Sequence, residues 1–157
     1  MESSEYIVYN HSDELTESER ELIEAASKAL PHSYAPYSTF HVASAIRLDN
    51  GEIITGVNQE NASSPAGLCA EQVALYRKGI AFPEARILAM AVVAQTEKHP
   101  DDPPAISPCG ICRQVMLEFV HRQEHSFPVL MQAGKDSWIK VLKMESLLPF
   151  GFTANSL

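Results

Sequence analysis

Three cysteines and one glutamate carry the clearest chemical pattern in this sequence. Cys109 and Cys112 form a C-x-x-C segment, Pro108-Cys-Gly-Ile-Cys112, and Cys69 lies earlier, in the tripeptide Cys69-Ala-Glu71. Cysteine thiolates grouped in this way are typical ligands of zinc. A carboxylate close to a zinc-bound water can act as a general base and then as a general acid. The pattern favours a catalytic zinc site in which Glu71 moves the protons.

Other interpretations of the same residues stay open. A lone cysteine is most often a small buried hydrophobic residue, although a group of three argues against that. A redox protein would need a reversible disulfide between Cys109 and Cys112. A structural zinc module would need a fourth ligand, for which His99 and His121 are nearest to the second pair, and Glu71 would then be idle. Metal content and the effect of Glu71→Gln on catalysis discriminate these alternatives.

Two helices are expected to present the cysteines at their first turns, where unpaired N–H groups favour thiolates. One helix is predicted to begin near Cys69, to run to about Lys78 and to stop at Gly79. The other helix has an apolar face made of Cys112, Val115, Met116, Phe119 and Val120. Because both helices follow strands, their N-termini can meet at one edge of the sheet.

The first part of the chain is predicted to form a helix and a β-hairpin. Thr16 and Glu19 match a capping box that begins the helix, and Pro31 ends it. The hairpin is expected over residues 42–57, with Asp49-Asn50-Gly51 as its turn.

A central strand is predicted from the unbroken apolar run at residues 87–94, which suits burial on both faces. Short strands follow at residues 128–131 and 139–142. The expected loops are residues 34–40, 58–67 and 99–107. This order implies one α/β domain with helices on both faces of a mixed sheet.

Composition limits the classes of function. The 157 residues suffice for a single domain, and residues 1–13 are interpreted as a flexible N-terminal extension. A net charge of −8 disfavours polynucleotide partners but is compatible with a small neutral nucleoside. We see neither a signal peptide nor an apolar run of membrane-spanning length, so a cytoplasmic protein without a membrane partner is expected.

Taken together, the motifs resemble the homotetrameric cytidine deaminases with a three-cysteine zinc site. The resemblance spans roughly residues 34–152. It is carried by Asn58-Gln-Glu-Asn-Ala62, Pro65, Cys69-Ala-Glu71 and Pro108-Cys-Gly-Ile-Cys-Arg-Gln114. It implies a three-layer α/β/α sandwich with a mixed central sheet and one zinc ion per subunit. The implied reaction is deamination of cytidine and deoxycytidine to uridine and deoxyuridine, with release of ammonia, in pyrimidine salvage.

The resemblance also implies roles for individual residues. Cys69, Cys109 and Cys112 would hold the zinc, and Glu71 would carry a proton from water to N3 of cytosine and then to the departing ammonia. The substrate-binding positions that it implies are Phe40, Asn58, Glu60, Ala62, Ala70 and Phe152. Phe40 would stack on the base, and Asn58 and Glu60 would bind the ribose hydroxyls. Ala62 and Phe152 would complete a neighbour's pocket, which makes the active sites of the tetramer composite.

The sequence departs from the family pattern at several positions. Gln72 stands where the family usually has an arginine that hydrogen-bonds the ligand sulfurs, and we expect Arg113 to supply the missing positive charge unless it is a structural helix residue. Ser63-Ser64 and Val42-Ala-Ser-Ala45 also differ. An uncharged residue 72 and the Val-Ala-Ser-Ala stretch resemble blasticidin-S deaminase, which acts on a larger cytosine nucleoside. That enzyme is the alternative interpretation.

Overall fold

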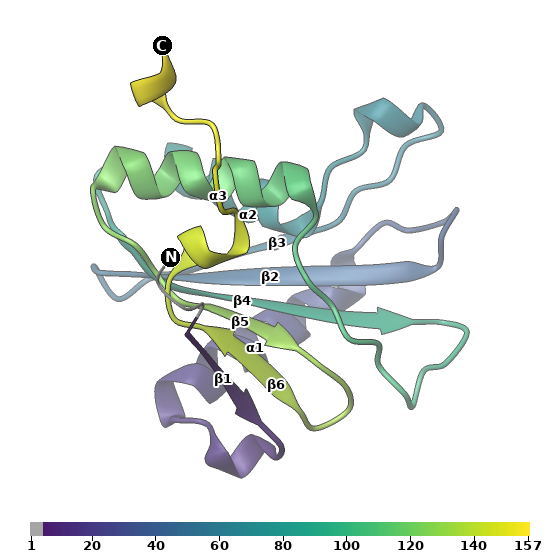
Figure 1. Cartoon of the computed structure of the whole chain (residues 1–157). Helices are drawn as coiled ribbons and strands as arrows, with labels where there is room; N and C mark the ends of the chain where they lie inside the picture. Colours follow the sequence, from purple (N-terminus) through teal and green to yellow (C-terminus); the bar gives the residue numbers. More distant parts are fainter. Residues whose placement is uncertain (1–4) are drawn as a thin grey trace.

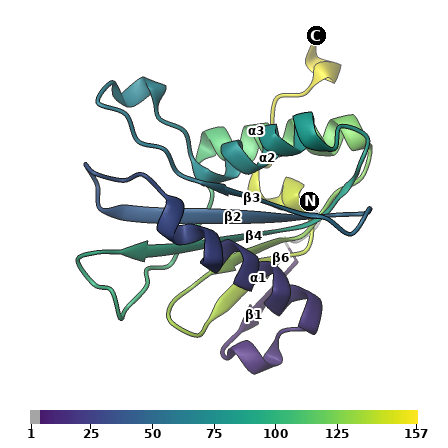
Figure 2. The ribbon, with the colours of Figure 1, turned by 180° about the vertical axis from the view of Figure 1, so that it is seen from behind.

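A mixed six-stranded sheet separates one helix from two others in this computed structural model, which describes residues 5–157. The strands are β1 (Tyr6–Tyr9), β2 (Phe40–Leu48), β3 (Ile53–Val57), β4 (Ile87–Thr96), β5 (Val129–Gln132) and β6 (Trp138–Val141). They lie in the order β1-β6-β5-β4-β2-β3, and the β4–β5 pair is parallel. The helices are α1 (Glu17–Ala29), α2 (Ala70–Ala81) and α3 (Gly110–Gln123). Helix α1 covers one face, and α2 and α3 lie together on the other (Figures 1 and 2). The predicted α/β/α sandwich is confirmed.

Helix α1 begins and ends where the sequence predicts. The Thr16 side chain accepts a hydrogen bond from Glu19 N, and the Glu19 carboxylate accepts one from Thr16 N. Leu22 and Ala26 are buried against the sheet. Pro31 follows in a short 3₁₀ turn. The local signals suffice here because capping depends on residues only three positions apart.

The predicted hairpin is present as β2 and β3, with Gly51 at a φ of +89° in the turn between them. Burial differs from simple alternation, since every residue from Val42 to Ile46 is buried. The reason is tertiary: α1 covers one face of β2 and α2 contacts the other, so the side chains on both faces lose solvent.

Strand β1 is not foreseen by the sequence analysis, which assigns residues 1–13 to a flexible extension. Residues 6–9, Tyr-Ile-Val-Tyr, pair antiparallel with β6, with Tyr6 opposite Val141 and Tyr9 opposite Trp138. Residues 1–4 of the expected extension lie outside the described residues. The partner strand lies more than a hundred residues away, so the pairing leaves no local signal.

Helix α2 does not stop at Gly79 as predicted but continues to Ala81. An interior glycine costs about 1 kcal/mol relative to alanine, a preference that tertiary contacts can override. Here α2 packs against α3, and a Cβ atom at residue 79 would lie 3.9 Å from the Phe119 ring. Within residues 5–157, no helix is both long and apolar enough to span a membrane.

The position of α2 depends on a close approach to β3 at Gly56. A Cβ atom at residue 56 would lie 2.3 Å from Ala74 N and 2.5 Å from Ala70 O. Both neighbours are helix backbone, which cannot rotate away. A glycine is therefore required where α2 crosses β3.

We predict that Gly56→Ala lowers the free energy of unfolding by about 2 kcal/mol or more, because the added methyl group must displace the helix. Gly79→Ala in the same helix is the matched control, since its Cβ makes an ordinary contact and should change stability by about 1 kcal/mol or less, in the stabilising direction. Urea denaturation measures both values. Equal effects of the two substitutions would contradict the close-approach argument.

Candidate metal centre and active-site pocket

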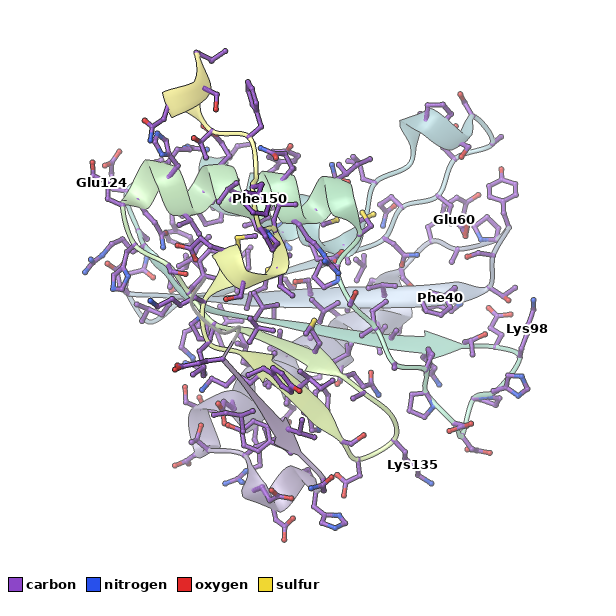
Figure 3. The ribbon with its side chains drawn as sticks, viewed as in Figure 1. Phe40, Glu60, Lys98, Glu124, Lys135 and Phe150 are labelled. Carbon is purple, nitrogen blue, oxygen red and sulfur yellow. The ribbon has the colours of Figure 1, made fainter. Side chains whose placement is uncertain are left out.

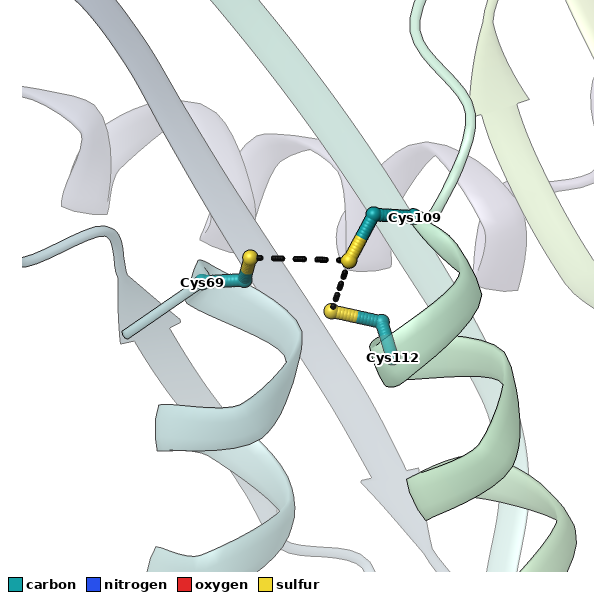
Figure 4. Close-up of side chains that lie close together, drawn as sticks. All are labelled: Cys69, Cys109 and Cys112. Atoms are coloured by element: carbon teal, nitrogen blue, oxygen red, sulfur yellow. Dashed lines mark hydrogen bonds between the residues drawn. The ribbon is translucent and has the colours of Figure 1, made fainter. Parts of the chain in front are cut away.

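The three cysteines meet at the N-terminal ends of two helices. Cys69 is the N-cap residue of α2, Cys109 is the N-cap residue of α3, and Cys112 lies in the first turn of α3. Their sulfur atoms lie 3.8 Å apart for Cys69 and Cys109 and 3.4 Å apart for Cys109 and Cys112 (Figure 4). All three sulfurs lie within 4.8 Å of one another. The convergence expected from the sequence is present.

This geometry fits a zinc ion. Two sulfurs bound to zinc at about 2.3 Å and at the tetrahedral angle lie about 3.8 Å apart. A disulfide would require about 2.05 Å, and all three cysteines are free. Three sulfur donors leave one position of a tetrahedron for another ligand, as in catalytic zinc sites.

The electrostatics of the cluster also call for a cation. Hydrogen bonding with Cys112 lowers the pKa of the Cys69 thiol to about 7. The same contact, together with burial, raises the pKa of Cys112. Ionisation of one thiol therefore opposes ionisation of the next, and a bound cation is what can hold all three as thiolates.

Neither histidine considered as a fourth ligand joins the cluster. Among the described residues the group comprises Cys69, Cys109 and Cys112 alone. His99 lies in the loop after β4, and His121 lies near the far end of α3. The site is therefore open rather than closed by a fourth protein ligand from this part of the chain.

A pocket of about 690 Å³ opens beside the cluster, a volume within the usual range of small-molecule sites. Its lining residues are Tyr37, Ser38, Phe40, Val42, Asn58, Gln59, Glu60, Asn61, Ala62, Ser64, Gly67, Leu68, Cys69, Ala70, Glu71, Ile106, Ser107 and Cys109. Phe40, at the start of β2, and Glu60, in the loop that follows β3, lie at the same end of the sheet (Figure 3). Of the described lining residues, Glu60 and Glu71 are the acidic ones, and none is lysine, arginine or histidine.

Glu71 is the buried acid of this pocket. It lies in the first turn of α2, two residues after Cys69, with 3% of its surface exposed. Burial raises the pKa of its carboxyl group above the ordinary value. A buried carboxyl group beside a metal centre is placed where a general acid–base catalyst could exchange protons with a bound water and a substrate.

Asn58 and Glu60 line the pocket but already hold its walls together. The Asn58 side chain accepts from Val42 N at 2.9 Å and donates to Phe40 O at 2.9 Å. The Glu60 carboxylate accepts from Ser38 N at 3.2 Å and from Ser38 Oγ at 2.9 Å. Both residues therefore hold the start of β2 and the loop before it in place. Only part of the hydrogen-bonding capacity of each side chain remains for a ligand.

Ala62 and Ala70 also line the pocket, whereas Phe152 does not. Phe152 lies on the C-terminal segment with 59% of its surface exposed, and its carbonyl oxygen accepts a hydrogen bond from Gln114 Nε2 at 2.8 Å. Within one chain, the structure thus brings together all the sequence-predicted substrate positions except Phe152.

Gln72 and Arg113 lie beside the cysteines and hydrogen-bond nitrogen or oxygen atoms around them. Gln72 Oε1 accepts a hydrogen bond from Cys69 N at 3.4 Å. Arg113 donates to Pro108 O at 2.8 Å, to Leu147 O at 2.9 Å and to Ser107 Oγ at 3.0 Å. The donors of Arg113 are thus directed at oxygen atoms, which favours the structural alternative over a role as a compensating charge beside the sulfurs.

Sequence reasoning missed several pocket residues, of which Tyr37, Ser38, Leu68, Ile106 and Ser107 are examples. They lie in segments predicted only as loops or left unassigned. Ser38 faces Glu60 across 22 positions of sequence, so no local pattern links the two. The polar and aromatic residues of the loop at residues 34–40 could have indicated a pocket wall, because such loop residues are often functional.

Comparisons with known proteins agree with this geometry. Residues 16–125 match the family model described as the cytidine and deoxycytidylate deaminase zinc-binding region. A cytidine deaminase from Halalkalibacterium halodurans is 36% identical over 138 residues, which cover 87% of this chain and 95% of the relative. The crystal structure of cytidine deaminase from Burkholderia pseudomallei has a TM-score of 0.70 and 35% identity, covering 88% of this chain and 100% of that one. Blasticidin-S deaminase from Bacillus cereus is 27% identical over 145 residues, which cover 90% of this chain and 96% of the relative.

We predict that the purified protein carries about one zinc ion per chain and that a strong chelator exposes three reactive thiols per chain as it removes the metal. The sequence has three cysteines and all of them lie in the cluster, so thiol titration counts the ligands directly. Emission spectrometry measures the metal. Three thiols that react equally fast before and after chelation would contradict the assignment.

Proposed function

This chain belongs to the cytidine and deoxycytidylate deaminase family, and from that premise we propose that it converts cytidine and deoxycytidine to uridine and deoxyuridine, with release of ammonia. It is a zinc-dependent hydrolase of that family. The observation that carries the proposed reaction is the buried carboxyl of Glu71, which lies at a nucleoside-sized pocket beside a three-thiol cluster.

The chain's own residues divide the work. Cys69, Cys109 and Cys112 would hold the zinc, which when bound acts as a Lewis acid and lowers the pKa of a water molecule. Glu71 accepts the proton of the attacking water and delivers it to N3 of cytosine. Glu71 then takes the second proton from the hydroxyl group now on C4 and transfers it to the amino nitrogen, which leaves as ammonia as its bond to C4 breaks. The water oxygen remains on C4 as the carbonyl of uridine.

Substrate orientation is assigned to the pocket walls. Phe40 supplies an aromatic face for the base. Glu60 can accept hydrogen bonds from ribose hydroxyls, and Asn58 retains one N–H for donation beyond its two backbone contacts. Ala62 and Ala70 are small and leave room for the nucleoside. The support for these roles is that all five side chains line one pocket.

We also propose that the working form is a homotetramer. Large apolar side chains are exposed on α2, on α3 and on the C-terminal segment: Tyr76, Ile80, Ile111, Phe150 and Phe152. Phe150 is 98% exposed, and a monomer in water gains nothing from such a position (Figure 3). Contact between subunits would cover these side chains and allow Phe152 to reach a neighbour's pocket. We further propose that the protein is cytoplasmic and acts in pyrimidine salvage; cysteines without a disulfide suit a reducing compartment.

A modified cytosine nucleoside of the blasticidin S type is the second candidate substrate. Its support is the similarity to blasticidin-S deaminase over 90% of this chain, together with an uncharged residue at position 72. Ordinary nucleosides remain the first choice because Asn58 and Glu60, assigned to the ribose, are both retained. A structural zinc module is the alternative of a different class.

We predict that Glu71→Gln lowers kcat by about 10²-fold or more while the zinc content stays at the wild-type level, because glutamine keeps the shape of the side chain but cannot cycle a proton. Ammonia release and metal analysis are measured on the same preparations. Glu118→Gln, the same substitution on the exposed face of α3, is the matched control and should retain most of the activity. A Glu71→Gln protein with near-normal kcat would overturn the role assigned to Glu71, whereas a zinc-loaded wild-type protein that releases no ammonia would favour the structural zinc module.

We further predict that deoxycytidine is deaminated with a kcat/KM at least about a hundredfold above that of dCMP. The described lining of the pocket offers a phosphate no cation, and the Glu60 carboxylate at its wall repels one. Free cytosine should also react poorly, because Glu60 and Asn58 would lose their ribose partners. A panel of cytidine, deoxycytidine, dCMP, cytosine and blasticidin S makes the comparison. Best activity on dCMP or blasticidin S would overturn the assignment.

A further inference from the structure

Arg113 connects three separate parts of the chain beside the metal centre. Its guanidinium donates to Pro108 O at 2.8 Å, to Ser107 Oγ at 3.0 Å and to Leu147 O at 2.9 Å. Ser107 lines the substrate pocket, and Pro108 directly precedes Cys109. Leu147 ends a 3₁₀ turn at residues 144–147 that leads into the C-terminal segment. One side chain thus holds the pocket wall and the last turn before the chain terminus.

The loop that carries the pocket wall has few other anchors. Of the described residues from 103 to 108, Ile106 has the one amide that donates a backbone hydrogen bond, to Gln132 O at 2.9 Å. Pro103, Pro104 and Pro108 have no N–H group to donate. Beyond Ile106, whose side chain also packs on the sheet, the two hydrogen bonds from the Arg113 side chain are what hold Ser107 and Pro108 ahead of the ligand Cys109.

The C-terminal segment, residues 147–152, is held on α3 by the residue that follows Arg113 and by close packing. Gln114 Nε2 donates to Phe152 O at 2.8 Å. A Cβ atom at Gly151 would lie 2.3 Å from Leu117 Cδ2, so the chain passes directly over α3. In Figure 1 this segment, in yellow, lies against α3, in green. The C-terminal segment therefore packs on α3, the helix whose first turn carries Cys109 and Cys112.

We propose that Arg113 is a positioning residue for the deamination reaction: its guanidinium locks the wall of the pocket at Ser107 and the ligand Cys109 to the C-terminal segment, and the site requires the fork of donors rather than the charge. This proposal rests on the proposed function for the reaction that is affected. Arginine and lysine carry the same charge, but only the planar guanidinium can donate in three fixed directions at once. Comparing them separates the two roles.

The test uses Arg113→Lys and Arg113→Gln in the zinc-loaded protein, with Arg122→Lys and Arg122→Gln as matched controls. Arg122 lies on the same helix and stacks on the Phe119 ring at 4.6 Å, away from the pocket. Hydrogen exchange is measured for peptides covering residues 105–112 and 144–152. Release of zinc to a chelator and the pH profile of kcat/KM are measured in parallel.

Both Arg113 variants should exchange roughly tenfold faster in both segments, as expected when hydrogen bonds from a charged donor are lost. Both should release zinc faster and lose kcat/KM to a similar extent, with the acidic limb of the pH profile unmoved, while the Arg122 variants resemble the wild type. Wild-type behaviour of Arg113→Lys, or a limb that moves only in Arg113→Gln, would show that charge is what matters and would overturn the proposal.

Gly151→Ala tests the same connection from the other end without changing Arg113. Its methyl group would meet the Leu117 and Leu148 side chains, which are packed in or against the core, so the crowding should loosen the C-terminal segment and speed exchange at residues 105–112 as well as at 144–152. Faster exchange confined to residues 144–152 would refute the connection. Hydrogen exchange and zinc release can be measured without turnover. A wild-type chain that is inactive on cytosine nucleosides would therefore contradict the proposed function, while the exchange data would still test the role of Arg113.

Discussion

The structure depends on bringing the first turns of two helices to one point. Three sulfur atoms must lie within 4.8 Å of one another, yet they come from helices that follow different strands of the sheet. Helix α2 reaches its position because Gly56 of β3 allows the helix backbone to contact the strand directly. Helix α3 follows β4, the strand that pairs in parallel with β5. The start of α3 is held by the loop before Cys109, to which Arg113 donates hydrogen bonds. The metal centre is therefore a result of how both helices dock on one face of the sheet, while α1 completes the opposite layer.

The same docking buries the carboxyl group to which we assign the acid–base role. Because α2 starts at the metal centre and lies flat on the sheet, its second residue points into a buried position, where the Glu71 carboxyl has little contact with water. Burial of a carboxyl group favours its neutral form and raises its pKa. A structure built for stability alone gains nothing from an acid in this position. A buried carboxyl group is useful beside a cluster that binds a cation, where it can exchange protons with a ligand of the metal.

Pocket shape is set by hydrogen bonds between loops. Asn58 ties the end of β3 to the start of β2, and Glu60 ties its own loop to Ser38. These residues therefore shape the cavity, and the proposed function gives them a second task, which is to bind a sugar with their remaining hydrogen-bonding capacity. The C-terminal segment has a related position, because Gln114 and Arg113 attach it to the start of α3.

The sequence by itself determined the elements and the chemistry that depend on nearby residues. The capping box at Thr16, the turn at Gly51, the C-x-x-C pair and the Cys69-Ala-Glu71 tripeptide could all be predicted, because each is a contact or a pattern within a few positions. Only the tertiary structure decided that residues 6–9 form an edge strand, that α2 runs past Gly79, that Arg113 faces oxygen atoms rather than sulfur, and that Phe152 lies outside its own pocket. The physical reason is the same in each case: these features depend on partners far away in the sequence, and only the folded chain determines which groups come within hydrogen-bonding or packing distance.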